Sequence, residues 1–533
     1  MRTFLLTTFL SCFLLTSTVR ASKNTEHYDI LIYGATSSGV VAAYTAKKMG
    51  KSVILIATDE HVGGLSSGGL GQTDIGNKQA IGGISRDFYK RLGDIYGEEE
   101  TWQFEPSAAS KVFSDYLSEA DVPVIYNKRI DRVSKENEQI TSVVLVNTYG
   151  SRGKKKEISA DVFLDCTYEG DLLALAGVSY TVGREDNSQY GETYSGFHLP
   201  EYHKVSGYHQ FPDGVSPYVD PDDPSSGLLW GISDMKPVEN GVGDKGVQAY
   251  NFRICLTDSA ENRIPITRPK DYDPKKYELL VRLFEAQPDM RKIGQYFIWT
   301  RMPNRKTDVN NRGGFSTDMI GENHNWPEAS FKERKKIFEE HLSYTKGLLY
   351  FFVSDERVPD SLQNFVSQWG YPKDEYLDNN HFTPQLYIRE GRRMVGEYVM
   401  TEHNCTGKAT IDDPIGMGAY GMDSHNVNRL VMNGMVKNEG NVEIRVKSPY
   451  SISYRAITPK REECTNLLVP IALSASHIAF GSIRMEPVFM VLGQSAAVAA
   501  VQAIDQKTIV QDIEYNTLKK ELLKQDQILY LAN

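Results

Sequence analysis

The sequence predicts an α/β protein in which a Rossmann-type domain is split between the two chain ends and an α+β domain is inserted between the halves. Residues 28–57 contain an apolar β-type run, a Gly-Ser-Thr turn, a helix rich in small residues and a second β-type run. This order is typical of a βαβ unit. Residues 467–504 add a short apolar strand, a polar turn and a Gly/Ala-rich helix. We therefore assign residues 28–185 and 455–533 to one domain and residues 186–454 to the insertion.

The composition indicates a large globular protein. The chain has 533 residues, of which 40% are hydrophobic and 24% are charged, enough to build at least two packed domains. A net charge of -10 gives no general attraction to phosphate backbones, so we do not expect nucleic acid as a partner. Cysteines at 166, 255, 405 and 464 are widely spaced without a CxxC pair, so we predict no metal site. A Cys405–Cys464 disulfide and free buried thiols both fit this spacing.

The first 21 residues have the layout of a secretory signal. Arg2 precedes an apolar stretch from Phe4 to Leu15, which is followed by small residues and Ala21. The stretch is shorter than the roughly 20 residues that cross a bilayer, and no later segment has a transmembrane pattern. We therefore expect export to the periplasm or medium after cleavage near Ala21, in preference to lipid anchoring at Cys12.

The turn after the first strand is a degenerate nucleotide-binding motif. Gly34 and Gly39 occupy the first and third glycine positions of G-x-G-x-x-G, and Thr36 stands at the second. Small residues still permit close approach of a ligand, and the N–H groups of the following helix would point at a diphosphate. Ala57 ends the second strand, where an acidic ribose-binding residue is usual. This motif alone leaves open a βαβ unit that binds no nucleotide.

The following segment is unusually rich in glycine. Eight glycines lie within about twenty residues, at positions 63, 64, 68, 69, 71, 76, 82 and 83. Such a segment brings backbone amides close to a ligand or makes sharp turns. Its position directly after a Rossmann strand favours the ligand-binding interpretation over a flexible loop.

Two further positions fit a ligand site at the strand ends. A strand ends at Asp165 and a helix begins near Gly170, which places Asp165 and Thr167 at the edge where open α/β sheets bind ligands. In the C-terminal half, Pro487 opens a helix whose N-terminus favours a nearby negative charge. A buried C-terminal helix without a ligand is the alternative.

These segments together resemble the FAD-dependent oxidoreductase family of glutathione-reductase-like topology, and within it a secreted bacterial branch sometimes labelled xanthan lyase-like. The resemblance runs from about residue 28 to 504. It is carried by YGATSSGVVAA, HVGGLSSGGLGQTDIGNKQAIGGI, DCTYEGDLLALAGVSYTVGRE, VQAYNFRICLT, MPNRKTDVNN, YIREGRRMVGEYVMTEH, GMGAYGMDSHN and SHIAFGSIRMEPVFMVLGQSAA.

The resemblance implies bound FAD and a set of contacting residues. It implies contacts to the diphosphate, the ribityl chain, the adenine and the flavin from Gly34, Thr36, Ser37, Ser38, Gly39, Gly63, Gly64, Ser66, Ser67, Ile130, Asp165, Thr167, Gly493 and Gln494. Thr36 and Ala57 depart from the family pattern. These departures indicate that the adenosine end is bound mainly through backbone atoms or with reduced affinity.

The inserted region and the C-terminal segment after it contain the residues that we expect to bind the substrate and react with it. The inserted region is rich in Tyr, Trp, Pro, Asn and Asp, side chains that stack on and hydrogen-bond to a sugar-like ligand, although ordinary Tyr-rich packing has the same composition. Residues 328–350 and 387–402 look helical, and we interpret their basic clusters as solvated helix faces. Hydride removal needs a base, for which His477 and His425 are our candidates. Arg484 is suited to bind a carboxylate or the reduced flavin, or to pair with Glu486 or another acid.

The leading functional hypothesis is therefore an FAD-dependent dehydrogenase or oxidase. It would remove a hydride from a small hydroxylated, sugar-like or amine substrate and pass electrons to an acceptor that the sequence leaves open. The alternatives are a carbohydrate lyase or another non-redox carbohydrate-processing protein on the same fold, and a carbohydrate-binding protein without catalysis. Family membership alone does not decide among these reactions.

Overall fold

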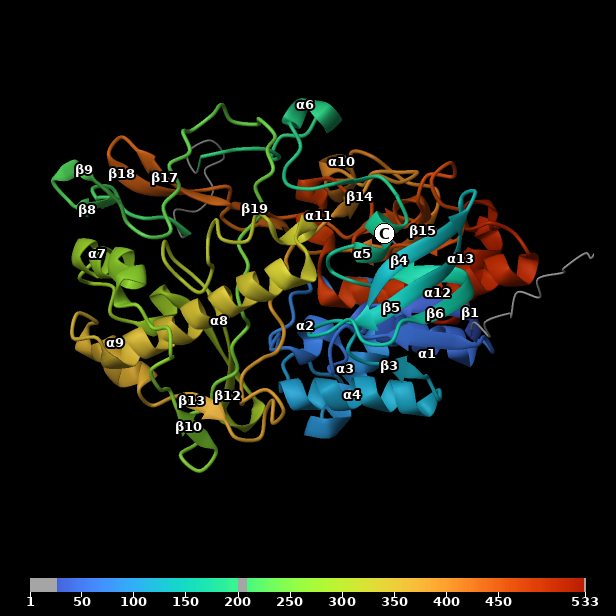
Figure 1. The fold of residues 1–533 in the computed structure, drawn as a ribbon, viewed down its shortest axis with the longest axis horizontal. Helices are drawn as coiled ribbons and strands as arrows, with labels where there is room; N and C mark the ends of the chain where they lie inside the picture. Colours follow the sequence, from blue (N-terminus) through green and yellow to red (C-terminus); the bar gives the residue numbers. More distant parts are fainter. Residues whose placement is uncertain (1–25, 200–208, 532–533) are drawn as a thin grey trace, which may run out of the picture.

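The computed structural model describes residues 26–199 and 209–531 (Figure 1). The predicted signal peptide, residues 1–21, lies outside the described residues.

A seven-stranded sheet organises the first domain. Its order is β3-β2-β1-β6-β5-β4, and β21 also pairs with β6. The strands are β1 (Glu26–Tyr33), β2 (Val53–Ile56), β3 (Val124–Ile125), β4 (Lys128–Glu136), β5 (Gln139–Asn147), β6 (Lys156–Asp165) and β21 (Leu467–Leu468). The β4–β5 and β5–β6 pairs are antiparallel, and the other pairs of this sheet are parallel. The apolar second half of β1 and all of β2 are buried, as expected for strands covered on both faces.

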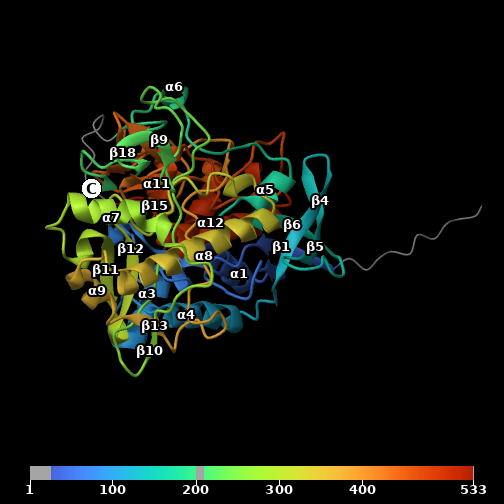
Figure 2. The same ribbon diagram turned by 60° about the vertical axis from the view of Figure 1, so that its left-hand side comes forward.

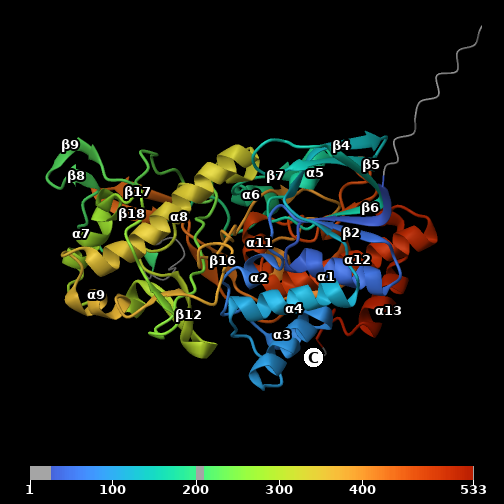
Figure 3. The same ribbon diagram turned by 60° about the horizontal axis from the view of Figure 1, so that its bottom comes forward.

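The C-terminal part of the chain completes this domain. β21 pairs with β6 through Leu467 opposite Phe163, more than 300 positions apart in sequence. Helices α1 (Ser37–Lys48), α4 (Pro106–Glu119) and α12 (Glu486–Gln506) lie on one side of the sheet (Figure 3). The predicted α/β fold with a Rossmann-type unit built from both chain ends is confirmed, whereas the domain boundaries stay predictions.

Small residues let α1 and α12 pack closely. A Cβ added at Gly493 would lie 2.4 Å from the backbone oxygen of Ser38. α12 is the one described helix that is long and apolar enough to cross a membrane by length and composition. Since almost all of its apolar stretch is buried inside the protein, it is a core helix here. The remaining helices of this half are α2 (Gly64–Ser67), α3 (Gly83–Tyr96), α5 (Asp171–Leu175), α11 (His477–Ile483) and α13 (Tyr515–Lys524).

The middle of the chain consists of short two-stranded sheets and three longer helices. The strands are β7 (Tyr180–Thr181), β8 (Tyr218–Asp220), β9 (Asp223–Leu228), β10 (Arg263–Pro265), β11 (Phe297–Met302), β12 (Lys306–Asn311), β13 (Gly370–Pro372), β14 (Arg393–Met394), β15 (Pro414–Gly418), β16 (Met422–Ser424), β17 (Asn428–Met432), β18 (Met435–Glu439), β19 (Val442–Ile444) and β20 (Tyr450–Ser453). The helices are α6 (Asn187–Tyr190), α7 (Glu278–Ala286), α8 (Phe331–Ser354), α9 (Asp360–Val366) and α10 (Glu402–Cys405).

Helix α8 joins the two regions. Ser330 and Glu333 form a capping box that fixes where it begins. One end of α8 contacts α5 through the Arg334–Asp171 pair, and the other end packs on α9 (Figure 2). The predicted helix over 328–350 therefore exists, with bounds shifted by a few residues.

The predicted helix over 387–402 is wrong. This segment is extended, apart from the pair of β14 with β7 and the start of α10 at Glu402. Gly391 runs close to the backbone of Tyr168, where an added Cβ would lie 2.6 Å from the Tyr168 oxygen. Its arginines are not solvated either, because Arg389 and Arg393 are buried in ion pairs with Asp318, Glu185 and Glu390. Ion pairing therefore overrides the helical pattern.

Candidate functional site

A first cavity, of about 490 Å³, opens where the carboxyl ends of β1, β2 and β6 meet. We call it the sheet-edge cavity. Its lining includes Gly34, Ala35, Thr36, Thr58, Asp59, His61, Gly64, Tyr149, Thr167, Tyr168, Glu169 and Asp171 from the sheet domain. α8 and residues 384–388 form the opposite wall. Its position matches the ligand site expected of an open α/β sheet.

The turn between β1 and α1 is shaped for close approach of a ligand. Gly34 has a φ of +104°, and a Cβ there would lie 2.6 Å from the backbone oxygen of Cys166. A Cβ at Gly39 would lie 1.9 Å from the Gly34 oxygen. Thr36, at the usual second glycine, caps α1 by accepting a hydrogen bond from Gly39 N at 3.2 Å. The threonine therefore preserves the turn, and the residues present fit a bound diphosphate.

Ser37 and Ser66, two of the predicted FAD contacts, converge on Glu486. Both hydroxyls donate to Glu486 Oε2, and the Tyr168 hydroxyl donates to Oε1 at 2.6 Å. Complete burial raises the pKa of Glu486, and these three hydrogen bonds offset only part of that effect. The first residue of α12 is therefore a buried carboxyl group at the meeting point of α1, α2 and α12, a feature that sequence reasoning missed.

The remaining predicted FAD contacts are placed in several ways. Gly63 precedes α2 with a φ of +94°, and Gly64 and Thr167 line the sheet-edge cavity. Asp165 accepts hydrogen bonds from Thr167 and from Leu173 N, and burial raises its pKa to about 6. The other positions do not line this cavity: Ser37, Ser38, Gly39, Gly63, Ser66, Ser67, Ile130, Asp165, Gly493 and Gln494. Ile130 is buried in β4, and Gln494 accepts from Ile84 N at 2.8 Å.

A second cavity, of about 680 Å³, is lined mainly by the middle region, with polar and apolar surface in equal measure and many polar side chains. We call it the polar cavity. Its lining includes Asp74, Asn77, His209, Asn310, Asn311, Tyr387, Tyr420, Asp423, His425, Asn441, Glu443, Arg445 and Lys447. Side chains from at least six separate segments build this wall, and His425 is the predicted catalytic residue among them.

His425 stands between two carboxylates that are each held by an arginine. Its Nδ1 lies 2.8 Å from Asp318 and its Nε2 lies 3.5 Å from Asp423. Arg389 pairs with Asp318, and Arg484 pairs with Asp423, each at 3.0 Å. Burial opposes ionisation of both aspartates, but these cationic partners and His425 hold their pKa values below the ordinary range. Arg484 thus binds an acid other than Glu486.

His477 has a different environment. It is fully buried, with Nδ1 2.8 Å from Glu390 and Nε2 2.9 Å from the Ser424 hydroxyl. Burial opposes ionisation of Glu390, but His477 and Arg393 lower its pKa to about 2. Ser424 is adjacent in sequence to both Asp423 and His425. The structure therefore brings His425 and Arg484 together at the polar cavity and places His477 behind that wall.

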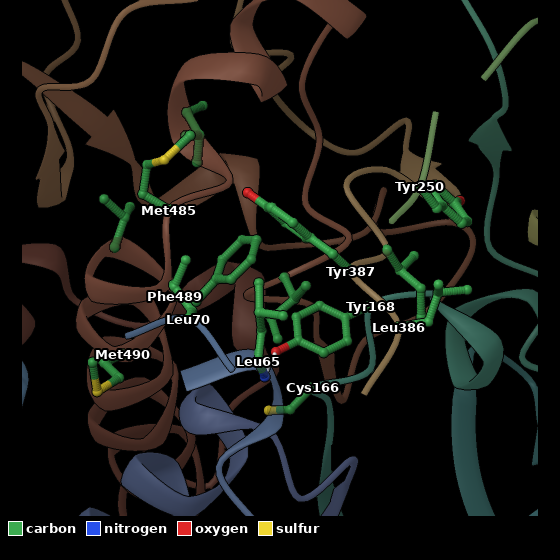
Figure 4. Packing of buried hydrophobic residues seen from close by; sticks show 14 of the residues in the cluster. Leu65, Leu70, Cys166, Tyr168, Tyr250, Leu386, Tyr387, Met485, Phe489 and Met490 are labelled. Atoms are coloured by element: carbon green, nitrogen blue, oxygen red, sulfur yellow. Dashed lines mark hydrogen bonds between the residues drawn. The ribbon is translucent and has the colours of Figure 1, made fainter. Parts of the chain in front are cut away.

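One extended segment separates the two cavities. Pro384, Gln385, Leu386 and Ile388 line the sheet-edge cavity, whereas Tyr387 lines the polar cavity. Figure 4 shows the Tyr387 ring directed away from Leu386, toward Met485 and Phe489. Arg484 donates to the Tyr387 hydroxyl at 2.8 Å. Tyr387 and Asp423 are further site residues that the sequence did not reveal.

The described residues offer no group of three or more His, Cys, Asp or Glu side chains that would hold a metal ion. The four cysteines 166, 255, 405 and 464 are buried and free, so Cys405 and Cys464 are not bridged.

The Rossmann-type turn and its cavity define a dinucleotide-binding α/β protein. The sequence profile described as FAD dependent oxidoreductase matches residues 29–522. The chain belongs to the FAD-dependent oxidoreductase family, and FAD is its cofactor. The predicted family is thus confirmed, while the xanthan lyase-like label stays a prediction.

Solved structures give short matches only. A flavin-dependent brominase is 19% identical over 30% of this chain and 43% of its own, with a TM-score of 0.24. THI4 from Thermovibrio ammonificans is 17% identical over 30% of this chain and 66% of its own, with a TM-score of 0.23. Bacillithiol disulfide reductase from Bacillus cereus is 18% identical over 26% of this chain and 39% of its own, with a TM-score of 0.20. The chain spans less than two thirds of each of these proteins. No curated protein matches.

Proposed function

We propose that this flavoenzyme oxidises a small hydroxylated, sugar-like or amine substrate bound in the polar cavity, with His425 as the general base. The observation that carries the proposal is the position of His425 on the cavity wall between Asp318 and Asp423. When bound, FAD supplies the hydride acceptor. The residues suited to hold it are the turn from Gly34 to Gly39 and the segment from Gly63 to Ser67.

The hydrogen bonds of His425 suit a base. Asp318, an ionised acceptor, accepts a hydrogen bond from the Nδ1–H group, and this tautomer leaves the lone pair on Nε2. Nε2 is then the atom that removes the proton of a substrate hydroxyl or ammonium group. Asp423, 3.5 Å away, stabilises the imidazolium that results.

The cavity walls support a substrate with several polar groups. Four asparagines and two tyrosines offer donors and acceptors together with flat apolar faces, at positions 77, 310, 311, 441, 387 and 420. Arg484 holds the Tyr387 hydroxyl and the Asp423 carboxylate at once. We therefore assign Arg484 the role of positioning the wall between the two cavities.

An anaerobic visible spectrum of the purified protein tests the proposal. Sugars, polyols, hydroxy acids and amines are added one class at a time, and the flavin bands bleach with the class that is oxidised. An elimination product formed without bleaching would move the assignment to a carbohydrate lyase. A protein that stays colourless after reconstitution with FAD would overturn the flavoenzyme assignment.

Comparing the culture medium with the cell fraction tests our further proposal that the protein is exported.

A further inference from the structure

We infer that helix α8 of the middle region is part of the FAD site, and that the ammonium group of Lys335 attracts the FAD diphosphate. The inference rests on the FAD assignment and adds a binding wall that no Rossmann motif encodes. Rossmann motifs describe only the sheet side of a dinucleotide site. α8 supplies the side opposite the β1–α1 turn.

One stripe of α8 faces the sheet-edge cavity. The lining side chains are Phe331, Arg334, Lys335, Phe338, Glu339 and Leu342. Their spacing of three, four and seven positions places them on a single helix face. The same cavity is lined by Gly34 and Thr36 of the turn and by Asp59 after β2. This stripe therefore faces the adenosine and diphosphate end of a bound dinucleotide rather than the flavin end.

A buried ion pair fixes α8 against the sheet domain. Arg334 donates two hydrogen bonds to Asp171, at 2.6 and 2.8 Å, and a third to the Trp326 oxygen. Asp171 is the first residue of α5, and Arg392 binds the same carboxylate at 2.8 Å. Burial opposes ionisation of Asp171, but the two arginines lower its pKa. The charge of Arg334 is therefore used in this ion pair, and Lys335 is the cation of the α8 stripe that no buried carboxylate holds.

Lys335 is held near the cavity by weak contacts only. Its Nζ lies 3.8 Å from Glu339 and 5.4 Å from the ring centre of Tyr149, which lines the same cavity. Its side chain is 54% exposed, so it is able to turn toward a ligand. The same lining holds the acidic side chains of Asp59, Glu169 and Glu339, together with His61. A cation at this place offsets the repulsion between these acidic groups and a diphosphate.

The neighbouring residue provides a matched control. Lys336 forms the equivalent pair with Glu340 at 3.6 Å and is 77% exposed, but it does not line the cavity. Replacing either lysine removes one positive charge and one exposed ion pair with the glutamate four residues further along α8. A difference between Lys335→Ala and Lys336→Ala therefore reports the position of the charge and not the net charge or the helix stability.

The test titrates FAD, adenosine diphosphate and riboflavin into the full-length protein stripped of flavin, with calorimetry as the readout. For Lys335→Ala we expect about fivefold weaker binding of FAD and adenosine diphosphate at low salt, and a smaller loss at high salt, since exposed charges are screened. Riboflavin, which lacks the diphosphate, keeps its affinity. Lys336→Ala keeps all three affinities.

Equal affinities of wild type and Lys335→Ala, or equal losses in both variants, would overturn the role of Lys335. Hydrogen exchange tests the wall itself: FAD binding should slow exchange in residues 331–342, and unchanged exchange there would overturn the placement of α8. A wild-type protein that binds neither FAD nor adenosine diphosphate would instead contradict the cofactor assignment, so the two failures are distinguishable.

Discussion

The sheet-edge cavity and the polar cavity are built by different means. The sheet side of the sheet-edge cavity is formed by backbone atoms and glycines at the ends of neighbouring strands. The polar cavity is formed by side chains from widely separated segments. The sheet-edge cavity should therefore be sensitive to added Cβ atoms, and the polar cavity to the loss of single functional groups. This contrast explains why the cofactor could be inferred from a motif but the substrate could not.

The largest effect is expected at the polar cavity, from His425→Ala. Loss of a general base lowers kcat by roughly 100- to 10,000-fold. FAD affinity should stay unchanged, because His425 does not line the sheet-edge cavity. Steady-state rates and FAD titration of the same sample measure both quantities. A variant that loses FAD as well would show that the two cavities are not independent.

A smaller effect is expected at the sheet-edge cavity, from Gly39→Ala. The added Cβ would overlap the Gly34 oxygen at 1.9 Å, and overpacking costs about 1–3 kcal/mol, which on the FAD-binding turn corresponds to roughly fivefold to 160-fold weaker FAD binding. Gly294→Ala is the control, because no atom lies within 4 Å of its added Cβ. FAD titration that finds equal affinity for both variants would contradict the close approach of the turn.

The smallest effect concerns the pH dependence of FAD binding and Glu486. Its folded-state pKa is raised by burial, so the carboxyl group is neutral at low pH and ionises as pH rises through that raised value. The anion would stand beside Ser37 and Ser66, which we predict to contact FAD, and should weaken binding about fivefold. Glu486→Gln should bind FAD with equal affinity across this range.

Glu356→Gln, at an exposed carboxyl group of the middle region, should retain the pH dependence of the wild type. FAD titrations at a series of pH values check both variants. A pH dependence that survives in Glu486→Gln would assign it to another group.

The parts of the fold that the sequence predicted correctly depend on local patterns. The apolar runs of β1 and β2, the glycines at 34 and 39 and the small residues of α12 each have one compatible backbone role. The segment at 387–402 misled because its helical spacing of arginines serves buried ion pairs with Asp318, Glu185 and Glu390. Asp318 and Glu185 lie 71 and 208 positions from the arginines they pair with, outside any local pattern.

The site was predicted less completely than the fold. Sequence context gave equal weight to His425 and His477 as candidate bases; His425 lines the polar cavity, whereas His477 lies behind its wall, and both roles stay predictions. Tyr387, Asp318 and Asp423 have no motif around them, and only the folded chain brings them to His425. Arg334 belonged to a cluster we interpreted as solvated, although it is buried against Asp171. Tertiary ion pairs account for each of these differences.

The pairing of β21 with β6 also sets the order of events in folding. Residues 28–185 include β1, α1 and β6, but α12, which covers α1, is synthesised only after residue 485. The apolar face of α1 is consequently exposed for most of the time that the chain takes to emerge from the ribosome. Contacts between residues so far apart in sequence slow folding and prolong the exposure of aggregation-prone apolar surface. The turn that binds the nucleotide is therefore supported by its full packing only after the C-terminal helix α12 has docked on α1.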